Sequence, residues 1–197
     1  MTWAEAGEGD TRGAALGRGT LICEQADSCR LEGLQVIWRQ DKVSGRGHYS
    51  HRIAFSPDGQ YLFLSSGDRQ KMDPAQDYSV NLGKVLRLTL DGTPAPGNPW
   101  ARRGGRAAEF WSMGHRNVLG LAFAPDGRLW ATEMGPKGGD EINLILEGRN
   151  YGWPLVSYGS HYDGTPIPER LPGRSFEEPK VWWNTSVSPA GMIAYSG

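Results

Sequence analysis

Short runs that alternate between apolar and polar residues, each ended by a glycine or proline turn, recur along the chain and predict β-strands. The clearest runs are residues 85–90 and 141–146, and each is followed by an acidic residue and a glycine. Residues 1–5 have the same strand-like character. Strongly periodic helical stretches are absent from the sequence, so the pattern predicts an all-β protein.

One unit of strand, tight turn and strand occurs three times. Its copies span residues 54–63, 122–131 and 187–195, and their prolines at positions 57, 125 and 189 lie 68 and 64 residues apart. Proline presets φ at one turn position, and the Asp-Gly of the first two copies suits the left-handed end of the turn. Repeats of this length predict a β-propeller of four-stranded blades, and a sandwich of three hairpin units is the alternative.

The length of the chain limits the number of blades. About three blades fit into 197 residues, whereas a propeller needs at least four blades to close. We therefore expect residues 1–197 to form a single domain, a partial propeller that is truncated at both ends. The alternative is that the chain closes a ring by pairing with a second copy as a homodimer.

Charge and composition argue against several classes of partner. The formal net charge is −1 and the basic residues are dispersed, so nothing favours nucleic acid or an anionic membrane. The apolar runs are too short to span a bilayer, and the first residues do not resemble a signal peptide. Cys23 and Cys29 have no histidine at zinc-site spacing, which leaves a disulfide across a hairpin tip or two free thiols.

A histidine among small residues precedes the first repeated unit. His48 stands where a strand would enter the sheet, so its side chain could point into the central channel of a propeller. Imidazole is suited to general-base chemistry near neutral pH, and such a base needs an acceptor on its other ring nitrogen. Asp68, just after the next predicted strand, is the candidate acceptor. The alternative is a histidine on a surface loop.

Two further segments carry groups that bind ligands. Arg116 and Asn117 place a cationic fork beside an amide, a pair that can hold the carbonyl and carboxylate oxygens of an anionic cofactor. Gly135 and Pro136 cannot continue a regular strand, so their carbonyls are free to face a ligand such as Ca²⁺. The alternatives are an arginine bonded to a neighbouring loop and a solvated turn. Residues 148–154, taken alone, are interpreted as a structural turn.

Taken in order, these segments resemble the soluble PQQ-dependent glucose and aldose sugar dehydrogenases. The resemblance covers nearly the whole chain, and the ordered set is specific although each member alone is weak. The matching stretches are residues 47–50 with Arg52, 82–88, 114–117, 135–136 with 140–143, 150–154 and 186–192.

The resemblance implies a six-bladed propeller with PQQ and Ca²⁺ at the mouth of its channel. By position, His48 would take the proton from the anomeric hydroxyl of an aldose, with Asp68 orienting the ring. The hydride would pass to the C5 carbonyl of PQQ, whose oxygens Arg116 and Asn117 would bond. The product would be a lactone, and a dye, a quinone or a cytochrome would reoxidise the cofactor.

The same resemblance implies two calcium sites and a compartment. The carbonyls of Gly135 and Pro136 would hold the Ca²⁺ that polarises the quinone. Glu141 and the Tyr151 carbonyl resemble the ligands of a second, structural Ca²⁺. The implied compartment is the periplasm or the exterior, where a Cys23–Cys29 bridge would be compatible.

The chain departs from the family in what it lacks, and two other functions compete. The family's first blade supplies a glutamine to PQQ, and its later blades supply lysine and arginine residues. Because these blades are not in the chain, we expect the polypeptide alone to bind PQQ weakly and to be a poor catalyst. The alternatives are a non-catalytic propeller that binds protein or carbohydrate, against which His48 argues, and a calcium-dependent propeller lactonase, which Glu133 and Asn143 leave open.

Overall fold

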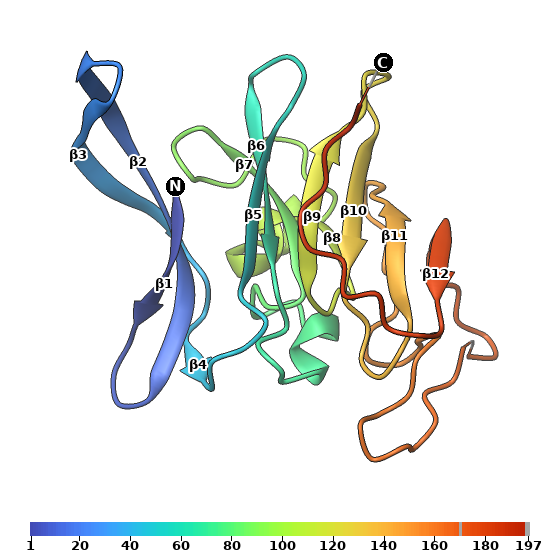
Figure 1. The fold of residues 1–197 in the computed structure, drawn as a ribbon. Coiled ribbons are helices and arrows are strands. Elements are labelled where there is room, and N and C mark those ends of the chain that lie inside the picture. The colour runs from blue at the N-terminus through green and yellow to red at the C-terminus, as the bar shows by residue number, and fades with distance from the viewer. Residues whose placement is uncertain (170, 196–197) are drawn as a thin grey trace.

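The computed structural model describes residues 1–169 and 171–195, and they form three four-stranded antiparallel sheets that stand side by side (Figure 1). The first sheet contains β1 (Thr2–Ala6), β2 (Thr11–Gln25), β3 (Ser28–Arg39) and β4 (Val43–Ser44). The second contains β5 (Ser50–Phe55), β6 (Tyr61–Ser66), β7 (Lys84–Thr89) and β8 (Phe110–Met113). The third contains β9 (Val118–Phe123), β10 (Leu129–Glu133), β11 (Asp140–Leu144) and β12 (Val181–Trp183).

This arrangement confirms the predicted all-β propeller of four-stranded blades. In the second and third sheets each strand pairs with the next strand in the chain, as in a propeller blade. Within the described ranges the helical segments are three short 3₁₀ helices: η1 (Asp73–Gln76), η2 (Ala101–Arg103) and η3 (Gly105–Glu109). No helix in this part of the chain is long and apolar enough to cross a membrane.

The first two copies of the predicted turn form as expected. Between β5 and β6 the Gly59 amide donates to the Ser56 carbonyl at 2.8 Å, and Gly59 has a φ of 69°. Between β9 and β10 the Gly127 amide donates to the Ala124 carbonyl at 2.9 Å, and Gly127 has a φ of 81°. Glycine suits both positions because a left-handed φ is strained for other residues.

The third copy does not form the predicted hairpin. Residues 187–195 are in no strand and run beside β9 (Figure 1). The amides of Val187 and Ser188 donate to the Asp140 carboxylate at 2.7 Å, and the Ala190 carbonyl accepts from Thr132 at 3.3 Å. The prediction was wrong because a strand requires a backbone ladder, and this segment bonds to side chains instead.

The long β2–β3 hairpin was not predicted as a pair of strands. Its outer half is exposed on both faces, so it lacks the alternation of buried and exposed residues that identifies a strand. Cys23 and Cys29 lie opposite each other in the ladder and form a disulfide with Cα atoms 4.1 Å apart. Of the two predicted states of these cysteines, the structure has the bridge across the hairpin tip.

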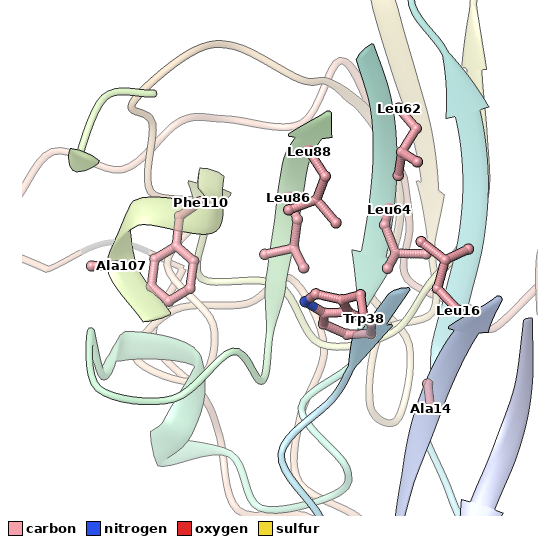
Figure 2. Packing of buried hydrophobic residues seen from close by; sticks show 9 residues of the cluster. All are labelled: Ala14, Leu16, Trp38, Leu62, Leu64, Leu86, Leu88, Ala107 and Phe110. Atoms are coloured by element: carbon pink, nitrogen blue, oxygen red, sulfur yellow. The ribbon is translucent and has the colours of Figure 1, made fainter. Parts of the chain in front are cut away.

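The second sheet is buried on both faces. Leu62 and Leu64 of β6 point toward the first sheet, where they pack with Trp38 of β3 (Figure 2). Phe63, between them, points the other way and packs with Val118 and other residues of the third sheet. Successive side chains of a strand alternate in direction, so one strand contributes to two cores and fixes the sheets against each other.

A charged side chain lies inside the second sheet. Lys84 of β7 is fully buried, and its ammonium donates to the carbonyls of Pro74, Ala75 and Leu82 at 2.7, 3.1 and 2.7 Å. Burial lowers the pKa of Lys84 to about 7, and the carboxylates of Asp77 and Asp41 oppose this effect. The unfolded state therefore binds more protons than the folded state between about pH 7 and the ordinary lysine pKa of 10.5.

We expect the free energy of unfolding to rise with pH across this window. The contribution of Lys84 has a slope of up to about 1.4 kcal/mol per pH unit. Urea denaturation at several pH values between 7.5 and 9.5 measures the slope. Lys84→Met is the control. Methionine has no titratable proton, so the free energy of unfolding of this variant should be lower at every pH and should rise less steeply with pH. Parallel slopes for the two proteins would contradict the prediction.

Candidate functional site

The candidate site lies at one end of the second and third sheets, where four strand ends meet. β5 and β9 begin at this end, while the antiparallel strands β6 and β10 finish there, as the pairing of Ser50 with Ser66 and of Val118 with Glu133 shows. Figure 1 shows these loops gathered at the lower edge of the sheets. Antiparallel pairing thus brings together segments that are far apart in the sequence.

The structure brings His48 and Asp68 together. His48 precedes β5, Asp68 follows β6, and His48 Nδ1 lies 2.7 Å from Asp68 Oδ1. Asp68 is fully buried, whereas the side chain of His48 is 14% exposed. Because Nδ1 is bonded to the carboxylate, the opposite ring nitrogen, Nε2, is the one left to meet a ligand.

The Asp68 carboxylate is held from several directions. Its Oδ1 also accepts from the backbone amide of Gln70 at 2.8 Å, and its Oδ2 accepts from the Trp153 indole at 2.8 Å. The Asp68 amide donates to the Arg116 carbonyl at 2.9 Å. A carboxylate fixed in this way imposes one orientation and one tautomer on the imidazole that it bonds.

A pocket of about 190 Å³ opens beside His48. Its walls come from the loops that precede β5, that follow β6, that join β8 to β9, and that follow β10 and β11. Its lining consists of His48, Asp68, Gln70, Met72, Arg116, Pro136, Trp153, His161 and Tyr162.

Arg116 is the cation of this pocket. Its Nη1 donates to the carbonyls of Met134 and Gly135 at 3.0 and 2.7 Å, and its Nη2 donates to the Tyr162 hydroxyl at 3.2 Å. The guanidinium carbon lies 5.4 Å from the ring centre of Trp153 and 6.0 Å from that of Tyr162. Among the described residues no partner bonds its buried Nε. The guanidinium therefore lines the pocket while three hydrogen bonds hold it in place.

A buried network fixes the backbone that carries Arg116. Glu133, at the end of β10, accepts from the Arg116 amide through Oε1, and its Oε2 lies 2.9 Å from His115 Nδ1. The other nitrogen of His115 lies 2.8 Å from Ser112 Oγ, and the His115 ring stacks on Tyr151. Because Glu133 bonds the Arg116 backbone amide, the network connects to the pocket through Arg116.

Asn117 lies behind the pocket and is not part of its lining. Its Oδ1 accepts from the Ser50 hydroxyl at 3.1 Å, and its Nδ2 lies 4.0 Å from the Met134 sulfur. Of Arg116 and Asn117, the structure therefore places only Arg116 in the pocket lining.

The chemistry of the donor set around Gly135 fits a hard cation. The Gly135 carbonyl accepts from Arg116, and Pro136 lines the pocket. A Cβ at position 135 would lie 2.3 Å from the carbonyl oxygens of Gly138 and Gly139, so this turn crowds backbone oxygens together. Carbonyl oxygens of this kind are ligands that Ca²⁺ prefers.

Glu141 and Tyr151 border a small cavity that Arg116, Gly135 and Pro136 also line. This cavity of about 20 Å³ is lined by Glu133 as well, and its volume holds about one water molecule or ion. Desolvation and then the nearby Glu133 carboxylate raise the pKa of Glu141 to about 8. In residues 1–169 and 171–195 no three His, Cys, Asp or Glu side chains converge on one point, so backbone oxygens would have to complete either site.

The sequence did not predict the roles of Trp153 and Tyr162 at the site, and it suggested Glu133 only as a possible lactonase residue. Trp153 belongs to the stretch interpreted as a structural turn, yet it bonds Asp68. Glu133 holds Arg116, and Tyr162 is 73% exposed at the mouth of the pocket. The place of Trp153 within residues 150–154, a stretch that resembles the family, was the one available signal, whereas Tyr162 stands in a loop without any recognisable motif.

The family model and the curated relative that this chain matches both describe sugar dehydrogenases. The family model described as glucose/sorbosone dehydrogenase matches residues 1–197. The chain is 36% identical over 200 residues to the aldose sugar dehydrogenase YliI of Escherichia coli (strain K12), covering 100% of this chain and 53% of that protein. Thus the chain spans about half the length of curated relatives that it matches.

Solved structures agree in fold. A crystal structure of a glucose dehydrogenase matches with a TM-score of 0.91 and 43% identity, over 100% of this chain and 57% of that one. The PQQ-bound form of an aldose sugar dehydrogenase from Streptomyces coelicolor matches with a TM-score of 0.70 and 30% identity, over 98% of this chain and 52% of that one.

Proposed function

We propose, from the premise that this chain belongs to the glucose/sorbosone dehydrogenase family, that it carries the general base of a PQQ- and Ca²⁺-dependent aldose dehydrogenase. The reaction would oxidise the sugar at its anomeric carbon and yield a lactone. The observation that carries the proposal is the His48–Asp68 pair, which faces the same pocket as Arg116. A purely binding module has no need for an oriented base beside a cation.

In the proposed reaction, each residue of the pocket has its own role. His48 Nε2 would accept the proton of the anomeric hydroxyl, while Asp68 holds the Nδ1 proton and stabilises the imidazolium that forms. Arg116 would donate to the oxygen on which negative charge develops, with Asn117 supporting it from behind. When bound, PQQ would supply the quinone that accepts the hydride from the sugar.

Calcium would be held by groups that the chain supplies. The carbonyls of Gly135 and Pro136 would bind the ion that polarises the cofactor, and Glu141 with the Tyr151 carbonyl would bind a structural ion. The crowded backbone oxygens at Gly135 and the small acidic cavity beside Glu141 support this assignment.

The setting of the enzyme follows from the same proposal. We infer a periplasmic or secreted location, which the Cys23–Cys29 disulfide supports, since such bridges persist in oxidising compartments. A dye, a quinone or a cytochrome would take the electrons from the reduced cofactor.

Titration of the purified chain with PQQ in excess Ca²⁺ tests the function. We expect weak but saturable binding that needs Ca²⁺, and bleaching of the quinone absorbance when an aldose is added. Cation binding is measured separately as a rise in Tm with Ca²⁺ in the absence of PQQ. PQQ binding without bleaching at any aldose concentration would argue for a binding module, and lactone hydrolysis without PQQ would argue for a lactonase.

A further inference from the structure

We infer that Arg69 is a positioning residue for the general base, because its buried guanidinium fixes the loop that carries His48. The inference rests on the proposed role of His48 and adds a residue that does not itself reach the pocket. Arg69 is absent from the pocket lining, although it directly follows Asp68 in the chain.

The Arg69 guanidinium donates two hydrogen bonds to the loop before His48 and a third to a strand of the first sheet. Its Nε donates to the Gly47 carbonyl at 2.8 Å, and its Nη2 donates to the Gly45 carbonyl at 2.6 Å. Its Nη1 donates to the carbonyl of Arg12 in β2. One side chain thus ties the residues just before His48 to a strand of the first sheet.

Arg69 is also held in place itself. Its side chain is fully buried, and its guanidinium carbon lies 3.9 Å from the centre of the Tyr49 ring. Burying a charge is unfavourable unless the charge is well bonded, so a cation at this position is expected to serve a specific arrangement. Tyr49 is the residue that follows His48, so the stacking and the hydrogen bonds act on both sides of the base.

The His48 loop needs such support because its backbone is strained. His48, Ser50 and His51 have φ values of 50°, 59° and 52°, in the left-handed region that side-chain-bearing residues seldom adopt. Such conformations persist only where the surroundings determine them. We call the three hydrogen bonds from the Arg69 guanidinium the clamp. Without the clamp the loop would relax, and His48 Nδ1 would lose its alignment with Asp68.

Two neighbouring residues therefore set the base in different ways. Asp68 bonds the imidazole ring, whereas Arg69 bonds the backbone from which the ring projects. In addition, the Arg69 amide donates to the His48 carbonyl at 3.4 Å. Lysine is a poor substitute, because an ammonium on a flexible stem cannot reproduce the planar fork of three bonds.

Arg69→Lys is the test, and Arg87→Lys is the matched control. Arg87 lies in β7, donates to Asn98 and to the Pro96 carbonyl, and lies over the Trp111 ring, so it is also a bonded and stacked arginine. It is absent from the pocket lining. Loss of any hydrogen-bonded and stacked guanidinium would affect both variants alike, whereas loss of the hydrogen bonds to the His48 loop affects only Arg69→Lys.

The first readout is the state of the His48 ring in this chain without cofactor. Correlation spectra of ¹⁵N-labelled imidazoles distinguish ring tautomers, and the His48 signals are assigned by their loss in His48→Gln. We expect a single tautomer protonated at Nδ1 in the unsubstituted chain and in Arg87→Lys. In Arg69→Lys we expect that pattern to be lost to a mixture.

The second readout is sugar oxidation. In Arg69→Lys we expect kcat to fall by roughly 10- to 100-fold while KM for the aldose changes less than about threefold, since misplacement of a catalytic group slows the chemical step. If the unsubstituted chain oxidises no sugar, the proposed function fails. The imidazole ¹⁵N spectra would still test whether Arg69 positions His48.

An unchanged His48 pattern in a folded Arg69→Lys variant would overturn the inference. If that variant does not fold, Tyr49→Leu removes only the ring beneath the guanidinium. It should shift the His48 signals in the same direction by a smaller amount, and unchanged signals would again count against Arg69.

Discussion

His48→Gln is expected to lower kcat for aldose oxidation by about 10²- to 10⁴-fold, the range that a positioned general base contributes. Glutamine keeps hydrogen-bonding capacity near Asp68 but cannot take up a proton at neutral pH. PQQ binding should change little, because His48 acts on the substrate hydroxyl in the proposed mechanism. Rates are measured as PQQ- and Ca²⁺-dependent dye reduction, and cofactor binding by absorbance titration.

The chain contains a matched control for this substitution. His51 lies three residues away in β5, also has a positive φ, and bonds Thr2 Oγ1 at 3.0 Å, outside the pocket. His51→Gln should therefore leave kcat within about threefold. A similar loss in both variants would indicate damage to the strand rather than loss of a base, and an active His48→Gln would refute the assigned role.

Arg116→Lys is the second large effect, with an expected fall in kcat/KM of roughly 10²- to 10³-fold, the range seen when a donor to a developing oxyanion is removed. The guanidinium lies beside the rings of Trp153 and Tyr162 and bonds Tyr162 and two backbone carbonyls at once. A lysine would fill less of this space and would present a single ammonium to the pocket.

Arg128→Lys controls for the exchange of one cation for another. Arg128 is exposed on the β9–β10 turn and pairs with Asp126, so its replacement should leave kcat/KM within about twofold. Steady-state kinetics with varied aldose separate kcat from KM for both variants. A fall of less than about threefold for Arg116→Lys would show that this guanidinium does not stabilise the transition state.

The two effects have different structural origins. His48 depends on a loop held by Arg69 and on a carboxylate held by Trp153. Arg116 depends on Glu133, which bonds its amide and the His115 ring. Trp153 also lies beside the Arg116 guanidinium, so among these supports we expect substitutions of Arg69 to alter His48 first and substitutions of Glu133 to alter Arg116 first.

The local pattern of the sequence was sufficient for most of the strands. Residues 85–90 and 141–146 correspond to β7 and β11, and the turns at residues 56–59 and 124–127 form as predicted. These features are decided by neighbouring residues, because alternation sets which face of a strand is buried and proline and glycine set turn geometry.

In two segments, backbone pairing between strands decided whether a strand forms, and the pattern of apolar and polar residues did not. Residues 187–195 have the same turn signature as the other two copies but form no strand, because their amides and carbonyls bond side chains and not a ladder. The outer part of β2 and β3 shows the reverse, since a strand pair forms there without a buried face.

The sequence by itself determined the fold class, and its resemblance to a family identified His48, Asp68 and Arg116 as candidates. Only the tertiary structure decided how these groups are held. Trp153 bonds Asp68 across 85 residues of chain, and Arg69 bonds a strand of another sheet. Such contacts depend on how antiparallel strand ends converge, and no periodicity within one segment records which distant segments will meet.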